Sequence, residues 1–193
     1  LVGSEMCIRD SGFCAGGDIR MIAESGAGDG VQAKAFFLAE YRLNALMFGY
    51  SKPIAAIVDG VVMGGGVGIS EPAAVRIATE RTTYAMPETG IGLYPEVGGG
   101  WFLPRLPGQT GVWIGLTGAR LKAADTVALG IHTHFTPSEG VEALKADLLA
   151  APGDPAAVAA RHAKDAGPAP LAPHRAAIDR LFAFDTVEEI FTA

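Results

Sequence analysis

The chain has 193 residues, a length typical of one domain that can bury a sizeable core. It is 49% hydrophobic with a mean hydropathy of +0.28, but no run approaches the ~18 consecutive apolar residues of a membrane span. A net charge of −6 with scattered basic residues excludes nucleic acid as an expected partner. Only two cysteines, Cys7 and Cys14, and no secretory signal pattern predict a reducing, cytoplasmic location without disulfides.

Both ends of the sequence indicate a fragment. Residues 1–11 show neither strand alternation nor helical periodicity, and we expect them to be a non-native extension. Thr186 and Glu189 form a capping-box pattern that predicts a helix start, although only four residues follow it. Because the native N-terminus would then be missing, an organellar enzyme with a transit peptide stays an open alternative.

The expected elements begin with a long helix over residues 31–48, which contain no Pro or Gly and carry large apolar residues at helical spacing. A buried strand and a turn follow, and a glycine run leads into a short helix. The later expected elements are strands over 75–79, 83–86 and 131–135, and helices over 101–106, 110–116 and 123–129. Alternating strands and helices favour an α/β fold with parallel pairing.

The composition changes at Pro137 and becomes rich in Ala and Pro, with linker-like stretches over 150–155 and 166–170. We therefore expect a core domain over residues 12–136 and a helical C-terminal region over 137–193.

Two segments carry residues suited to chemistry on a carbonyl group. The run 63–68 (MGGGVG) follows the predicted strand 54–58 and offers backbone N–H groups without side chains in the way. The loop 84–100 contributes two carboxylates, Glu88 and Glu96. A carboxylate near bare backbone donors supplies a nucleophile or base and a binding site for an oxyanion. The glycine run alone is equally consistent with a tight strand-to-helix turn, and it lacks the P-loop and Rossmann spacings.

A third carboxylate, Glu40, lies on the same face of the predicted helix as Phe36, Phe37 and Leu43. A charged group on an apolar stripe is costly unless it is paired or used. Two plainer readings stay open: Glu40 at the exposed edge of the stripe, and Glu88 as a loop cap.

Several segments in order resemble the enoyl-CoA hydratase/isomerase (crotonase) superfamily. The matching segments run from about residue 12 to residue 135: FCAGGDIR at 13–20, Lys52-Pro53, MGGGVGIS at 63–70, the loop 84–100, and LTGARL at 116–121. The resemblance implies a crotonase fold, a spiral of ββα units with an acyl-CoA across them, followed here by the helical region. It also implies that the backbone N–H groups of Gly17 and Gly65 bind the thioester oxygen.

The carboxylates decide which reaction the resemblance implies. Hydratases of this superfamily use two glutamates, and this chain has Gly68 where the first would stand and Glu88 where the second stands. The pattern is most similar to the 3-hydroxyisobutyryl-CoA hydrolase branch, which implies catalytic roles for Glu88 and Glu96 and substrate binding by Glu40. That branch usually has Asp where this chain has Glu96. It also has a His-Gly pair where this chain has Glu71-Pro72, and nothing in the sequence explains this second change.

The resemblance thus implies hydrolysis of the thioester of a short 3-hydroxyacyl-CoA, with CoA as part of the substrate and no other cofactor. Two alternatives remain: an enoyl-CoA isomerase or hydratase, and an inactive acyl-CoA-binding module. A homo-oligomer is open as well.

Other residues are expected to be structural. His132 and His134 alternate on the predicted strand 131–135, but no acidic or cysteine partner lies at ligand spacing, so no metal site is expected. Cys14 has no nearby histidine to activate it and is expected to pack. Trp101 and Phe102 are expected in the core or in the wall of an acyl pocket.

Overall fold

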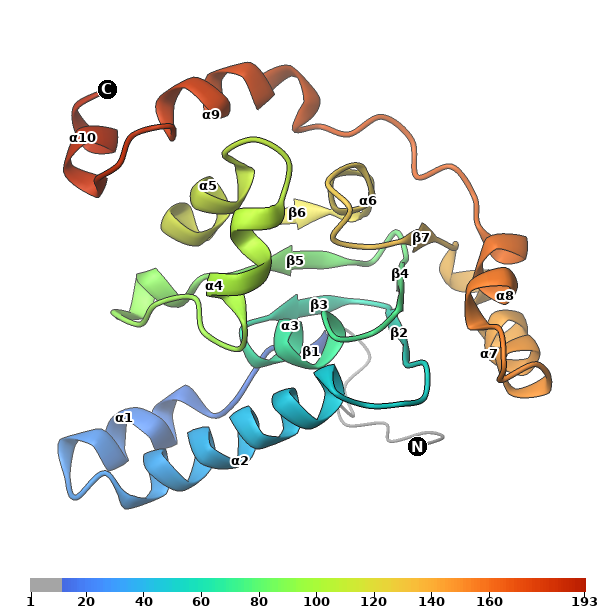
Figure 1. Ribbon diagram of the computed structural model, residues 1–193, viewed down its shortest axis with the longest axis horizontal. Coiled ribbons are helices and arrows are strands. Elements are labelled where there is room, and N and C mark those ends of the chain that lie inside the picture. Colours follow the sequence, from blue (N-terminus) through green and yellow to red (C-terminus); the bar gives the residue numbers. More distant parts are fainter. Residues whose placement is uncertain (1–11) are drawn as a thin grey trace.

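The structure is a computed structural model that describes residues 12–193 (Figure 1). Its strands are β1 Gly12–Cys14, β2 Ala55–Val58, β3 Val61–Met63, β4 Val75–Ala78, β5 Thr83–Ala85, β6 Leu121–Lys122 and β7 His134–Phe135. Its α-helices are α1 Ile19–Ala27, α2 Val31–Phe48, α3 Gly65–Ser70, α4 Gly99–Phe102, α5 Thr110–Thr117, α6 Ala123–Ala128, α7 Val141–Ala150, α8 Pro155–His162, α9 Arg175–Leu181 and α10 Val187–Thr192. Four 3-10 turns, η1 Glu88–Ile91, η2 Leu103–Arg105, η3 Ser138–Gly140 and η4 Ala172–His174, join them.

The strands form two small sheets, and the chain passes repeatedly from one to the other. One sheet has the order β1-β3-β5-β6, with β6 antiparallel and the other strands parallel. The second sheet is parallel with the order β2-β4-β7. The pairs β2–β3 and β4–β5 therefore each place one strand in each sheet before a helix or 3-10 turn follows, which is the expected spiral of ββα units (Figure 1).

Short polar contacts fix the corners between the sheets. Gly60, with φ +135°, makes the turn from β2 to β3. At the next corner the Thr82 hydroxyl donates to the Val58 carbonyl oxygen at 2.6 Å and accepts from the Thr79 N–H at 2.8 Å. Both threonines are fully buried. These contacts satisfy backbone groups that the short strands leave unpaired.

The main core lies between the two sheets and the helices that follow them. It contains strand residues such as Val58, Val62 and Tyr84 together with Ile114 of α5 and Ile178 of α9. A second cluster joins β4 to α7 and α8 through Ile77, Leu144 and Val158. Apolar contacts therefore connect the C-terminal helices to both sheets.

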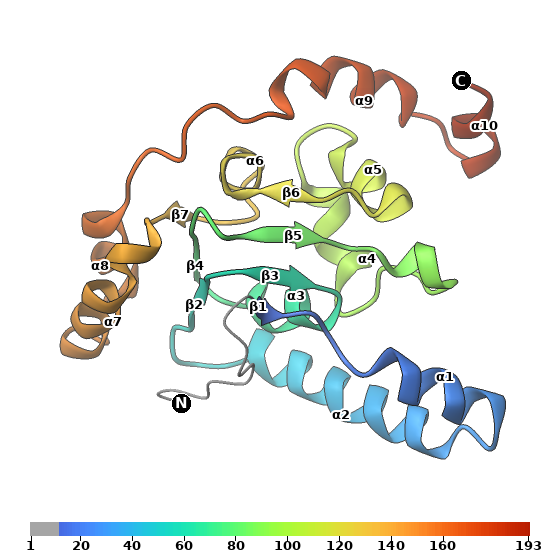
Figure 2. The ribbon, with the colours of Figure 1, turned by 180° about the vertical axis from the view of Figure 1, so that it is seen from behind.

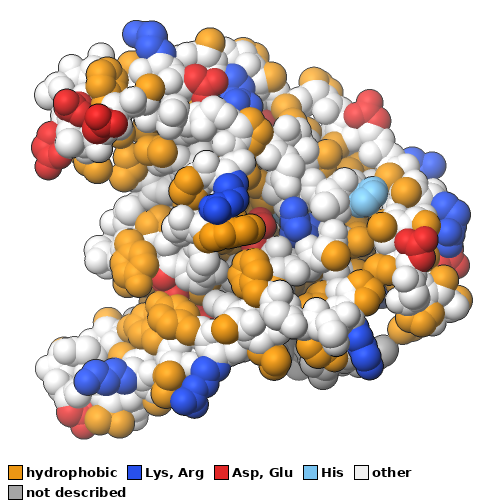
Figure 3. All heavy atoms as spheres, in the orientation of Figure 1, with side chains coloured by type: hydrophobic (Ala, Val, Ile, Leu, Met, Phe, Trp, Pro, Cys, Tyr) orange, Lys and Arg blue, Asp and Glu red, His pale blue; other side chains and the backbone are white. Residues whose placement is uncertain are grey.

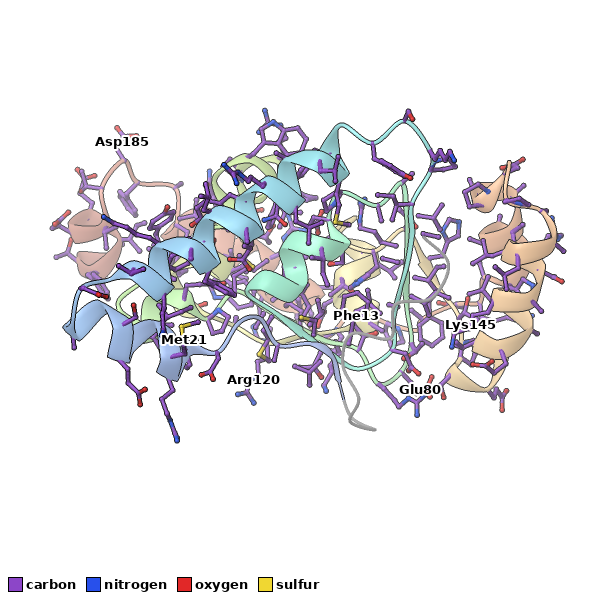
Figure 4. The ribbon with its side chains drawn as sticks, turned by 90° about the horizontal axis from the view of Figure 1, so that it is seen from below. Phe13, Met21, Glu80, Arg120, Lys145 and Asp185 are labelled. Carbon is purple, nitrogen blue, oxygen red and sulfur yellow. The ribbon has the colours of Figure 1, made fainter. Side chains whose placement is uncertain are left out.

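The outer helices project from this centre in three directions. The view from behind (Figure 2) shows the α1–α2 hairpin below the sheets, α7 and α8 at one end, and α9 and α10 above. Seen from below, α2 lies across α3, and the α1–α2 hairpin lies at the opposite end from α7 and α8 (Figure 4). None of the described helices is long and apolar enough to cross a membrane.

Several local predictions agree with the structure and others were wrong. The helix over 31–48 has the expected bounds, and Thr186 and Glu189 make both hydrogen bonds of the capping box. The strand expected over 131–135 is limited to His134–Phe135, because residues 131–133 lie in a bend and His132 is buried outside the strand. Trp101 is 56% exposed and stacks against the Arg105 guanidinium at 4.2 Å, so it is not a core residue. The extension predicted over 1–11 lies outside the described residues.

Candidate functional site

Two glycine segments meet beyond the ends of β1 and β3. Gly16 has φ +92°, and a Cβ atom built there would lie 3.1 Å from the backbone N of Gly65. A Cβ atom on Gly65 would in turn lie 3.3 Å from the Cα of Gly16. Glycine is needed at both positions, because the two backbones approach too closely for side chains. The sequence placed these segments 49 positions apart, and the parallel pairing of β1 with β3 brings them together.

The backbone N–H groups of Gly65 and Gly17 differ in where they lie relative to a helix. Gly65 is the first residue of α3, so its N–H has no acceptor within the helix and lies at the positive end of the helix dipole. Gly17 lies one residue before Asp18, the N-cap of α1, and thus outside the helix. The Phe36 ring covers it, since a Cβ on Gly17 would come within 2.2 Å of that ring.

The Glu88 carboxylate lies beside this pair of segments. Glu88 begins η1 and is 4% exposed, and Oε1 lies 3.2 Å from where a Cβ on Gly64 would stand. Both carboxylate oxygens are buried without a hydrogen-bond partner among residues 12–193. Burial, with a smaller contribution from the charge of Glu96, raises the pKa of Glu88. An unpartnered carboxylate with a raised pKa is suited to act as a base or nucleophile.

Glu96 lies in the same loop and is held more firmly. It is 7% exposed, and its Oε2 accepts a hydrogen bond of 3.0 Å from the Val97 N–H. Burial raises its pKa, while hydrogen bonding by the Tyr41 hydroxyl and by the Val97 N–H acts in the opposite direction. Tyr41, from α2, was not identified from the sequence as a site residue. Adjacent residues of a helix point in different directions, so its place after Glu40 gave no signal.

Glu40 reaches the site from α2 and completes a cluster of three carboxylates. Its Oε1 would lie only 2.3 Å from a Cβ on Gly65, so the carboxyl group rests against the Cα of that glycine. Its Oε2 is buried without a partner in the described part of the chain. Burial and then the charge of Glu96 raise the pKa of Glu40 to about 7. The half-buried side chain is therefore not a solvated edge residue.

Gly68 is enclosed by neighbours that the sequence did not identify. A Cβ there would lie 2.6 Å from the Cβ of Val97 and 3.1 Å from the Asn44 Nδ2. Val97, with φ +48°, is the one residue other than glycine with a positive φ in the described structure. This conformation is strained for a β-branched residue, and such strain is concentrated at functional sites. The space around position 68 cannot hold a glutamate without movement of these neighbours.

A further titratable group of the core is a histidine. His132 is buried, and its pKa falls to about 3 because burial disfavours the charged ring. Its ring meets Tyr84 edge-on at 6.4 Å between centroids. Within residues 12–193 no three His, Cys, Asp or Glu side chains are arranged to hold a metal ion.

The hairpin that supplies Glu40 forms a projecting arm of the molecule. In the space-filling view (Figure 3) the lower projecting arm is separated from the centre by a notch with hydrophobic side chains on its walls. This arm is the α1–α2 hairpin, which supplies Glu40.

Comparison with known proteins shows the family to which the chain belongs. The family model described as enoyl-CoA hydratase/isomerase matches residues 6–193. The 3-hydroxyisobutyryl-CoA hydrolase, mitochondrial, of Danio rerio is 46% identical over 190 residues, which cover 94% of this chain and 50% of the relative. Its counterpart from Xenopus tropicalis is 52% identical over 138 residues, or 72% of this chain and 36% of the relative. The chain spans about half the length of the curated relatives that it matches over most of its own length.

A solved structure, described as a carnitinyl-CoA dehydratase from Mycobacterium thermoresistibile, superposes with a TM-score of 0.88 at 41% identity, covering 95% of this chain and 54% of the other. The matched family model, the identities and the superposition agree with the two-sheet spiral. The chain belongs to the enoyl-CoA hydratase/isomerase family, and its fold is the crotonase fold.

Proposed function

We propose that this chain carries the site of an acyl-CoA thioester hydrolase acting on a short 3-hydroxyacyl-CoA, most plainly 3-hydroxyisobutyryl-CoA. The observation that carries the proposal is the pair formed by Glu88 and position 68. The buried Glu88 carboxylate lies unpartnered beside the glycine turn. At the position of the other hydratase glutamate this chain has Gly68, which Val97 and Asn44 enclose. The names of the zebrafish and Xenopus relatives support the same reaction.

In this proposal each group has a defined task. The Gly17 and Gly65 N–H groups polarise the thioester carbonyl and stabilise the negative charge that develops on its oxygen. Glu88 either attacks the carbonyl carbon, releasing CoA and giving a mixed anhydride that water then hydrolyses, or takes a proton from the water that attacks the thioester. Glu40 and Glu96 hold the substrate. The products are the free 3-hydroxy acid and CoA, and the reaction needs no metal or redox cofactor.

The competing proposal is hydration or isomerisation of an enoyl-CoA. The name of the mycobacterial structural relative, a carnitinyl-CoA dehydratase, supports the hydration chemistry, since dehydration is its reverse. Hydration with two carboxylates conflicts with the space at Gly68, where a side chain would meet Val97 within 2.6 Å. Isomerisation can proceed with one main carboxylate and is separated from hydrolysis only by its products.

The test is product analysis on one preparation with three substrates. We expect CoA release from 3-hydroxyisobutyryl-CoA, with negligible hydration of crotonyl-CoA and negligible isomerisation of a 3-enoyl-CoA. Comparable rates of hydrolysis and hydration would overturn the assignment. Thermal stabilisation by CoA esters without any turnover would instead indicate an acyl-CoA-binding module.

We further propose that the reaction serves valine degradation, the context that the substrate implies. The predicted cytoplasmic location is not established, and the mitochondrial names of the vertebrate relatives favour the organellar alternative. Homo-oligomer formation stays a prediction.

A further inference from the structure

The most buried side chain of α2 is a polar one. Asn44 is 6% exposed and is the one residue of this 18-residue helix that is classed as buried. Two leucines of the same helix, Leu43 and Leu46, are 40% and 62% exposed. This is the reverse of the usual preference, which places leucine inside and asparagine outside. The packing of α2 against α3 therefore serves something other than burial of apolar surface.

The Asn44 amide has no hydrogen-bond partner within residues 12–193. Both Nδ2 and Oδ1 are buried and unpaired. A buried amide without partners destabilises the fold, and a leucine of similar size would pack there without that penalty. The amide therefore has a donor and an acceptor that the described protein leaves unused.

The amide lies inside the carboxylate cluster described above. Asn44 follows Glu40 by one helical turn on the same face of α2. Its Nδ2 lies 3.1 Å from where a Cβ on Gly68 would stand, and Val97, whose N–H holds the Glu96 carboxylate, packs against the same glycine. Asn44 thus lies on the segment that carries Glu40 and shares the neighbour Gly68 with the segment that carries Glu96.

The spacing between Gly65, where the carbonyl oxygen would bind, and Gly68, beside Asn44, suits the length of a short acyl chain. Gly68 lies three residues after Gly65 in α3, which is a rise of ~5 Å along the helix. A group bound at Gly65 by its carbonyl oxygen can place a hydroxyl two carbons away next to Gly68. An alcohol both donates and accepts hydrogen bonds, as an amide does, whereas a carboxylate can only accept.

We propose that the Asn44 side-chain amide binds the 3-hydroxyl group of the acyl chain and so sets the preference for hydroxylated substrates. The amide oxygen accepts the hydroxyl proton and the amide nitrogen donates to the hydroxyl oxygen. This proposal rests on the proposed hydrolase function and identifies a specificity-determining residue of that site.

The test compares Asn44→Leu with the wild-type chain on 3-hydroxyisobutyryl-CoA and on isobutyryl-CoA, which lacks the hydroxyl group. We expect the ratio of the two kcat/KM values to fall about 10- to 100-fold, the size expected for loss of one buried hydrogen-bonding partner. Cleavage of isobutyryl-CoA should fall by less than cleavage of 3-hydroxyisobutyryl-CoA. The Tm should be unchanged or higher, because a buried unpartnered amide is removed. Asn44→Ala, which is smaller, should show the same loss of preference if leucine does not fit.

Gln32→Leu is the matched control, because Gln32 is an exposed polar residue of the same helix and should leave the ratio unchanged. Equal losses on both esters would overturn the proposal and assign Asn44 to the attacking water or to the fold. An unchanged ratio in both Asn44 variants would overturn it as well. If the wild-type chain cleaves neither ester, the proposed function itself fails, and this outcome is distinct from an unchanged ratio with active protein.

Discussion

Glu88 has a carboxyl group with which nothing in the described protein pairs. Its two oxygens have no hydrogen-bond partner within residues 12–193, and burial raises its pKa. Structural carboxylates are usually paired when they are buried, because an unpaired buried charge is costly. The position of Glu88 beside the Gly64–Gly65 turn therefore has the character of a reacting group.

Replacement of Glu88 by Gln should remove thioester cleavage and retain binding. The amide keeps the shape of the side chain but can neither attack a carbonyl nor accept a proton at neutral pH. We expect kcat to fall by about 10²–10⁴-fold, the usual contribution of such a group, in an assay of CoA release. Binding of a CoA ester, followed by its effect on Tm, should change little. Hydrolysis near the wild-type rate would assign the chemistry to another residue.

Glu40 should give the pH–rate profile a limb near neutrality. Its pKa of about 7 lies well above the ordinary value because of burial and the nearby charge of Glu96. As the pH rises through 7, Glu40 ionises next to Gly65 and its negative charge opposes the developing oxyanion. The kcat/KM value should therefore decline above pH 7.

The matching variant is Glu40→Gln, which stays neutral at every pH. The pH profile of kcat/KM for this variant should show no decline near pH 7, even if the variant is slower than wild type at every pH. A profile with the same alkaline limb in wild type and variant would show that another group titrates there.

Among the elements, α3 packs with little tolerance for added atoms. It lies against β1 so closely that a Cβ on Gly66 would come within 2.0 Å of the Cys14 carbonyl oxygen. Both partners are backbone, so the conflict cannot be relieved by a side-chain rotation. The close approach of α3 and β1 also sets the distance between the two glycine segments of the site.

Gly66→Ala should therefore destabilise the protein by about 1–3 kcal/mol, the usual cost of overpacking, and should reduce activity with it. Gly100→Ala is the matched control, since Gly100 lies in α4 with no atom within 4 Å of a built Cβ. That exchange should be neutral or stabilise by up to about 1 kcal/mol through helix propensity. Denaturant titrations of both variants measure the difference, and equal stabilities would contradict the packing argument.

The sequence predicted elements well where they are long and poorly where they are short. The helix Val31–Phe48 was predicted to its bounds because eighteen residues without Pro or Gly run between Gly30 and Gly49. The strands β1, β3 and β6 were missed, because two or three residues are too few to show alternation. Glu88 and Glu96 came from a motif within one loop. The roles of Asn44 and the strained Val97 could not be predicted, because they follow from the packing of α2 and the loop on α3, which a single sequence does not show.

For the whole molecule, buried His132 should make stability depend on pH. Its pKa is about 3 in the folded chain and ~6.5 when unfolded. Between these values the unfolded chain binds the additional proton, so stability falls as the pH falls from 6.5 toward 3. Between pH 7 and pH 5 this group alone should remove about 2 kcal/mol.

His132→Phe keeps an aromatic ring against Tyr84 and removes the titration. The loss of unfolding free energy between pH 7 and pH 5 should be smaller in the variant by about 2 kcal/mol. Glu71, whose pKa is raised to about 7 by burial, acts in the opposite direction in both proteins, so the difference between them isolates His132. Identical pH dependence in variant and wild type would be inconsistent with a buried neutral histidine.

In the described structure, β1 leads into the candidate site and lies at the edge of its sheet. In the described sheet β1 is an edge strand of three residues with β3 as its one neighbour, yet the Gly16–Gly17 segment follows directly from it. Edge segments of this kind open by local fluctuation at a free energy below that of global unfolding. Each opening separates Gly17 from Gly65 while the rest of the spiral stays folded. Amide hydrogens of residues 12–17 should thus exchange faster than those of β4, and mild denaturant should abolish turnover before helix content declines.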